Sequence, residues 1–247
     1  AEDFFKTISP KVTVREKEIF AFSKGKLSLE TLLFLNQFRW LKIDDKHRIN
    51  NNHDFYLGDD PEWSDILEDK DAIFEISTKV LSCIKSDNSN PSINKQTLYC
   101  ISGPPGSGKS AASLRIAREL IKVGHDVFWF KSETKLNVAS VKWCIDTFTN
   151  PVFIFDNFAD FANDVGNLIL ESSKSNAKLI VIGTERDQRM QHILQGISAD
   201  NLVMNGLKTD HLTDDDITRL ISKLESNNRL GKITRFSKSD KIGYFKK

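Results

Sequence analysis

The chain has 247 residues, and its 35 Lys and Arg nearly balance its 34 Asp and Glu, which gives a formal net charge of +1. This length predicts one or two domains with a sizeable core, and the 39% of hydrophobic residues fit a globular protein and exclude a disordered tract. The balanced charge does not favour nucleic acid as a partner, and the longest apolar runs are strand-sized, so we expect no membrane span.

Three cysteines, Cys83, Cys100 and Cys144, are widely spaced among apolar neighbours. This pattern argues against a disulfide framework and predicts a reducing compartment, and with no apolar signal core near the N-terminus we expect a cytoplasmic protein. The place of Cys100 directly before a Gly-rich loop suggests a redox switch, but its apolar surroundings favour a small buried strand residue.

The first part of the chain has weak patterns. We expect residues 1–57 to be an N-terminal segment or a linker from a preceding domain, with helical character over Leu27–Leu35. Residues 58–95 are predicted to form a helical segment, in which Asp60 before Pro61 is a typical helix start. Polar residues 86–94 predict a loop and a boundary.

A regular alternation of strands and helices begins at Gln96. The predicted strands are 97–102, 127–130, 151–155, 178–183 and 202–207, and the predicted helices between them are 110–123, 138–148, 161–172 and 189–195. Apolar strands separated by helices indicate a parallel sheet covered on both faces. We therefore predict an α/β core over residues 96–207, with a parallel five-stranded sheet.

Residues 208–247 are predicted to begin a small helical or winged-helix-like module. Thr213 is a candidate helix cap followed by three acids, and the helix is expected to end near Gly231. The sequence begins with Ala1 and ends within a pattern, so we expect the chain to be a piece of a longer protein.

The loop Gly103-Pro104-Pro105-Gly106-Ser107-Gly108-Lys109-Ser110 matches the phosphate-binding pattern G-x-x-x-x-G-K-[ST]. Its glycines let successive backbone N–H groups, up to that of Ala111, converge on phosphates, and the following helix points its positive end at the same charge. Lys109 is expected to reach the β- and γ-phosphates of ATP, and the Ser110 hydroxyl to hold Mg²⁺. The predicted strand before the loop and helix after it supply the context that this motif needs.

A second Mg²⁺ ligand is predicted at Asp156, because four apolar residues of a strand precede it and ligands bind at the carboxyl ends of parallel strands. The next position, where many ring-forming ATPases carry a catalytic Glu, is Asn157. We therefore expect slow or partner-dependent hydrolysis, and Asn157 either orients a water or plays a structural part in the turn.

The fourth strand of the core ends in Gly183-Thr-Glu-Arg186. Arg186 is a candidate contact for the γ-phosphate, because a guanidinium presents a fixed fork of donors to phosphate oxygens. The alternative is a surface Arg paired with Glu185 or Asp187, and the same choice applies to Arg189.

The phosphate loop, the strand that ends at Asp156 and the segment that ends at Arg186 together resemble the STAND class of P-loop NTPases. Two flanking segments, 55–66 and 211–217, are similar to those of bacterial STAND proteins of antiviral defence, the AVAST (Avs) type. The resemblance covers about residues 55–247, and no counterpart of the Gly-x-Pro element of plant and animal relatives is found.

This resemblance implies a sheet of the AAA-like division, with the fourth strand between the first and third, and an adenine near residues 56–63. It also implies the central module of a large sensor, in which a foreign protein triggers ATP-dependent self-association. Two other hypotheses remain: an AAA-like ATPase that acts with DNA as a loader or transposition helper, supported by the basic aromatic tail 235–247, and, ranked last, a small-molecule kinase.

Overall fold

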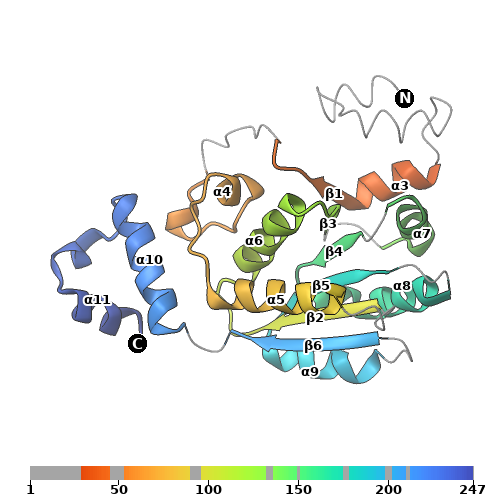
Figure 1. The fold of residues 1–247 in the computed structure, drawn as a ribbon. Helices are drawn as coiled ribbons and strands as arrows, with labels where there is room; N and C mark the ends of the chain where they lie inside the picture. Colours follow the sequence, from red (N-terminus) through yellow and green to blue (C-terminus); the bar gives the residue numbers. More distant parts are fainter. Residues whose placement is uncertain are drawn as a thin grey trace.

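The computed structural model describes residues 29–44, 53–89, 96–131, 136–148, 151–174, 178–197, 202–209 and 212–246. Its centre is a six-stranded sheet in the order β1-β3-β4-β5-β2-β6 (Figure 1). The strands are β1 (Phe38–Leu41), β2 (Gln96–Ser102), β3 (Val127–Phe130), β4 (Val152–Phe155), β5 (Ile180–Glu185) and β6 (Leu202–Lys208). All the neighbouring pairs from β3 to β6 are parallel, whereas β1 pairs antiparallel with β3.

The prediction of a five-stranded, all-parallel sheet is therefore corrected to a mixed sheet of six strands. The added strand β1 pairs Phe38 with Phe130 and Leu41 with Val127. It follows the helix α3 (Leu29–Gln37) without a single intervening residue, so no Gly or Pro marks where one element ends and the next begins. Four residues are also too few to show an alternating pattern.

Helices cover both faces of this sheet, as Figure 1 shows. One face packs against α3, α7 (Val138–Thr147), α8 (Ala162–Lys174) and α9 (Asp187–Gly196), and the other against α4 (Trp63–Leu67), α5 (Glu75–Ser89) and α6 (Lys109–Lys122). Alternate residues of β2 enter the two cores, with Leu98 and Cys100 in the first and Tyr99 and Ile101 in the second. This burial on both faces is what parallel strands between helices require.

The structure adjusts two local predictions and confirms a third. The helix expected to start at Asp60–Pro61 begins at Trp63, where Glu62 and Asp65 form a capping box. Helix α5 continues through residues 86–89, which were predicted as a loop, while 90–95 lie outside the described residues. Cys100 is buried on its strand, and burial raises the pKa of its thiol to about 12, so a redox role for Cys100 has no support.

The C-terminal residues form a separate small module of helices. It consists of α10 (Asp214–Ser226), the 3₁₀ helix η3 (Gly231–Arg235) and α11 (Lys238–Phe245), and it has its own core around Ile217, Ile221 and Leu230. The predicted cap at Thr213 is present, because its side chain accepts from the Asp216 N–H in a capping box. Figure 1 shows this module beside the α4–α5 region, away from the sheet. None of the helices in the described parts of the chain combines the length and apolar character needed to cross a bilayer.

Candidate nucleotide site

The phosphate loop connects β2 to α6 at the carboxyl edge of the sheet. Gly106 and Gly108 have φ angles of +75° and +79°, a left-handed conformation in which a Cβ is strained, so glycine suits both positions. An added Cβ at Gly108 would also lie 2.9 Å from the Phe74 ring. Phe74 therefore packs directly against the loop, a contact that sequence patterns did not indicate.

Thr209, immediately after β6, closes the base of the loop. Its N–H donates to the Ser102 carbonyl at 2.8 Å, and its hydroxyl lies 2.7 Å from the Ser107 hydroxyl. A Cβ at Gly103 would fall 2.0 Å from the Thr209 hydroxyl oxygen, which explains why the first loop position must be glycine. Sequence reasoning missed Thr209, because only the pairing of β6 with β2 brings it to the loop.

The Lys109 ammonium is held inside the same loop. It donates to the carbonyls of Gly103 and Pro104 at 3.1 and 2.7 Å and to the Ser107 hydroxyl at 3.3 Å. Burial lowers the pKa of Lys109, and the nearby Arg186 charge acts in the same direction. The lysine is thus positioned by the loop that it is predicted to serve, and its three donors would have to exchange loop acceptors for phosphate oxygens when a nucleotide binds.

The two predicted Mg²⁺ ligands lie together. The Ser110 hydroxyl donates to one oxygen of Asp156 at 2.8 Å, and Thr184, near the end of β5, donates to the other. Hydroxyl and carboxylate oxygens are the hard ligands that Mg²⁺ prefers, so this cluster fits the ion. Asp156 directly follows β4, and Ser110 is the second residue of α6. Strand β5 lies between β2 and β4, and its Thr184 lies beside the two predicted ligands at the same edge of the sheet.

Asn157 adopts a left-handed conformation with φ 54° and ψ 52°, and its side chain is exposed. Asn tolerates this conformation well, and the turn directs the next residue, Phe158, into the core. A Cβ at Gly183 would lie 2.8 Å from the Phe158 ring. These observations favour the structural interpretation of Asn157, and a role in orienting water remains a prediction.

The segment after β5 separates the two candidate arginines. Arg189 pairs with Asp160 and lies 3.6 Å from a carboxylate oxygen of Glu185, which matches the surface-pair alternative. Arg186 is exposed, its guanidinium makes no ion pair with the described residues, and its charge is felt by Lys109. Arg186 therefore remains the candidate phosphate contact of the two.

The sheet order, the phosphate loop and the serine–aspartate cluster can now be compared with known proteins. The model of a family described as Novel STAND NTPase 5 matches residues 53–197. The chain belongs to this STAND NTPase family. The match spans Phe74, the phosphate loop, Asp156 and Arg186. It ends before β6, so Thr209 and the C-terminal module lie beyond it.

No curated protein matches the chain. Among solved structures, it is similar to S. cerevisiae Hsp104 in an extended complex with casein, with a TM-score of 0.51 and 12% identity over 73% of this chain and 34% of that chain. It is also similar to a closed state of Hsp104 with ATPγS and casein, with a TM-score of 0.50 and 15% identity over 73% of this chain and 35% of that one. The chain thus spans about a third of the length of these structures.

At such low identity these likenesses concern the fold alone. They agree with a P-loop type of NTPase fold, and β5 lies between β2 and β4 as the resemblance to STAND proteins implies. Family membership and fold together establish a nucleotide-binding NTPase.

Proposed function

We propose that this STAND NTPase binds ATP with Mg²⁺ and hydrolyses it slowly, and that the bound nucleotide sets how the C-terminal module docks on the core. The observation that carries the proposal is the segment 73–75, which touches the phosphate loop on one side and the module on the other. Phe74 packs against Gly108, while the N–H of the next residue, Glu75, donates to Asp216 of α10 at 2.8 Å.

Asp216 is well placed to transmit a change in this segment. Its side chain is 4% exposed, and it also accepts from the Thr213 N–H at 3.2 Å as part of the capping box of α10. One carboxylate thus links the start of α5 to the start of α10. Movement of Phe74 on nucleotide binding would therefore be felt at the first turn of the module.

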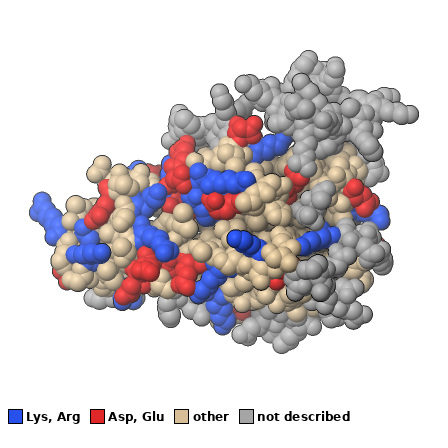
Figure 2. All heavy atoms as spheres, viewed as in Figure 1, with Lys and Arg blue, Asp and Glu red and all other residues tan. Residues whose placement is uncertain are grey.

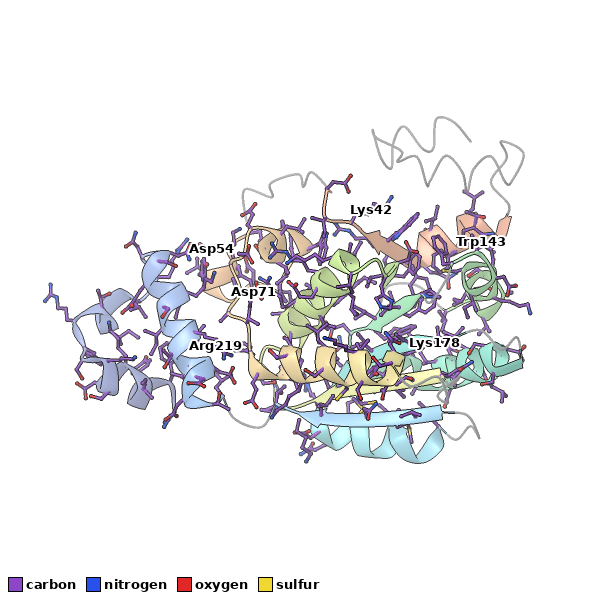
Figure 3. All side chains as sticks on the ribbon, viewed as in Figure 1. Lys42, Asp54, Asp71, Trp143, Lys178 and Arg219 are labelled. Atoms are coloured by element: carbon purple, nitrogen blue, oxygen red, sulfur yellow. The ribbon has the colours of Figure 1, made fainter. Side chains whose placement is uncertain are left out.

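Further hydrogen bonds and an ion pair join the module to the core. Arg219 donates to the Ile73 carbonyl at 3.0 Å, Lys223 donates to the Asp69 carbonyl, and Arg229 pairs with Asp54. Figure 3 shows Asp54, Asp71 and Arg219 along this junction. A cleft of about 400 Å³ lies there, lined in part by Ile73 and Arg219. Polar contacts around a cleft, with separate cores on either side, are typical of domains that move.

Nucleotide can shift such a docking equilibrium only by binding one arrangement more tightly than the other. The contact of Phe74 with Gly108 provides a route, because phosphates that fill the loop act on the backbone against which Phe74 rests. We propose that the ATP-bound arrangement permits self-association triggered by a foreign protein, in a bacterial antiviral sensor. This last step is supported by the resemblance of segments 55–66 and 211–217 to Avs-type proteins, although residue 211 lies outside the described residues.

The alternative, an ATPase that works on DNA, relied on the basic tail 235–247. In the structure Lys241 pairs with Glu225, and Lys246 pairs with Asp214. Figure 2 shows basic and acidic side chains interspersed over the visible face of the module. A mixed surface of this kind gives weak attraction to phosphate backbones, so the contacts favour the switch.

The test attaches spin labels to cysteines introduced by Lys122→Cys, at the end of α6, and Lys232→Cys, in η3. Cys83→Ser removes the half-buried native cysteine, which would otherwise compete for the label. We expect the distance distribution in ATP to differ from that in ADP. Asp216→Ala should broaden the distribution and remove its dependence on nucleotide, because the Glu75 N–H loses its acceptor. The matched control is Asp215→Ala, which changes an exposed acid in the same turn of α10.

Two results would contradict the proposal. One is an identical distance distribution in ATP, in ADP and without nucleotide, in protein shown to bind both nucleotides. The other is turnover near or above about one per second in the isolated chain, which is ordinary enzyme speed rather than that of a slow switch. Light scattering with and without ATP then measures self-association.

A further inference from the structure

We propose that Asp187 is the residue that positions the attacking water when this site hydrolyses ATP. The inference rests on the proposed function, because it concerns the same nucleotide, and it names the group that carries the residual hydrolysis. It answers a question left by Asn157, which is an amide where many related sites carry an acid.

Asp187 lies beside the phosphate loop in the fold. Strand β5 ends at Glu185, and Asp187 is the first residue of α9. In the parallel pairing of β2 with β5, Ser102 is opposite Glu185. The N–H of Gly103, the first loop residue, donates to the Glu185 carbonyl at 3.3 Å. The backbone is therefore hydrogen-bonded to the start of the phosphate loop at Glu185, two residues before Asp187.

Three carboxylates among the described residues exert their charge on the Lys109 ammonium: Asp156, Asp187 and Glu185. They are the acids that the fold places around the expected position of the terminal phosphates. The question is which of them has an oxygen free to accept a hydrogen bond from water.

Both oxygens of Asp156 and both oxygens of Glu185 already accept hydrogen bonds. One oxygen of Asp156 accepts from Ser110, and the other accepts from Thr184. The two oxygens of Glu185, which is 2% exposed, accept from the backbone N–H groups of Ala159 and Arg186 at 2.9 and 2.8 Å. Glu185 thus ties the turn after β4 to the turn after β5, which is a structural task.

Asp187 differs from both. Its Oδ1 is buried and accepts no hydrogen bond from any residue that the structure describes, while the side chain as a whole remains partly exposed. A buried carboxylate oxygen without a donor is costly, and such groups are retained where a ligand or water completes them. Neither oxygen of Asp187 accepts a hydrogen bond from the described residues, so the accessible part of this carboxylate, directly after the candidate phosphate contact Arg186, can accept from a water next to the terminal phosphate.

The step that Asp187 would assist balances as ordinary hydrolysis. The water oxygen forms a bond to the γ-phosphorus, and the bond from that phosphorus to the oxygen bridging to the β-phosphate breaks, so that ADP leaves with the electron pair. One water proton passes to the Asp187 carboxylate and then to solvent, and inorganic phosphate is the second product. A single positioned base of this kind typically contributes about 10²–10⁴-fold in rate.

The experiment compares Asp187→Asn with Asp160→Asn in the full chain. Asp160 is the other acid near the end of β4, but it is exposed and paired with Arg189, so it serves as the matched control. For each variant we would measure single-turnover ATP hydrolysis, the dissociation constants of ATP and of a non-hydrolysable analogue, and the thermal midpoint without nucleotide.

We expect Asp187→Asn to slow hydrolysis by about 10²-fold with an ATP affinity equal to or tighter than that of the parent, because a negative charge near the phosphates is removed. Its thermal midpoint should not fall, since Oδ1 accepts no hydrogen bond in the described structure. Asp160→Asn should hydrolyse ATP within about twofold of the parent.

Three outcomes would overturn the assignment: unchanged hydrolysis in Asp187→Asn, a loss of folding or stability that accounts for its rate, or a parent chain that binds ATP without any turnover. Each of these leaves ATP binding and the docking switch standing. Failure of the parent to bind ATP would instead overturn the proposed function itself, so the two failures are distinguishable.

Discussion

A buried ion pair joins the phosphate-loop helix to the segment that contacts the module, and its removal gives a quantitative test. Arg115 of α6 is 2% exposed and Asp71 is 3% exposed. The guanidinium donates through Nε to one oxygen of Asp71 at 2.9 Å and through Nη2 to the other. Arg115 also reaches Asp69 at 2.9 Å and Glu119 at 3.5 Å.

Asp71→Asn keeps the size of the side chain and removes its charge, which leaves the Arg115 guanidinium buried with weaker partners. Breaking a buried pair from one side costs about 3–5 kcal/mol. Because Asp69 remains in contact, we expect the lower end, about 3 kcal/mol in the free energy of unfolding. For a chain of this size that corresponds to a fall of roughly 6–12 °C in the thermal midpoint.

The assay is urea unfolding followed by tryptophan fluorescence, with Asp146→Asn, a change at an exposed site on α7, as the control. In the double variant Asp71→Asn, Arg115→Met, most of the lost stability should return, because the uncompensated charge is gone. A loss below about 1 kcal/mol in Asp71→Asn would refute the reasoning, since it would mean that Asp69 and Glu119 satisfy Arg115 without Asp71.

Three further predictions concern single sites. Gly183→Ala should cost about 1–3 kcal/mol in urea unfolding, because the new methyl would meet the buried Phe158 ring at 2.8 Å; the added change Phe158→Leu should restore part of this, and equal stability of the single variant would contradict the packing. The hydrogen bond to Asp65 raises the pKa of His53 above 6.5. The stabilising effect of protonated His53 is therefore complete below pH 6.5 and is lost as pH rises through the folded-state pKa. His53→Gln should flatten the dependence of the thermal midpoint on pH in that range, and an unchanged slope would contradict this pairing. Lys109→Ala should abolish the rise in thermal midpoint that ATP produces, and an equal shift in this variant would mean that ATP binds elsewhere.

The alternating core shows how far a local pattern reaches. Strands β2 to β6 and helices α6 to α9 were predicted within a few residues, because apolar runs of strand length between helices leave few other arrangements. The strand β1 was missed because Phe38 follows α3 without a turn residue, and its partner β3 lies about ninety positions later in the sequence. The helix start at Asp60–Pro61 was displaced to Trp63 because Glu62 and Asp65 form a better capping pair.

The candidate site divides in the same way. The phosphate loop, its lysine and Asp156 could be named from sequence alone, because their chemistry needs specific residue types at a fixed spacing or at the end of an apolar strand. Other contacts at the site join residues that are far apart in the chain, so no local sequence pattern predicts them. They are the hydrogen bond between Thr209 and Ser107, the packing of Phe74 against Gly108, and the hydrogen bond from the Ala159 N–H to Glu185.

The sequence by itself determined the class of chemistry: nucleotide phosphates bound at a glycine-rich loop between a strand and a helix. Only the tertiary structure decided what surrounds that loop. It brought Asp216 of the module to Glu75, beside Phe74, and it left Asp187 as the acid with an unsatisfied oxygen among those that act on Lys109. The physical reason is that a loop motif fixes backbone and charge within a few residues, whereas coupling and water positioning depend on groups that meet only when the sheet and the module have formed.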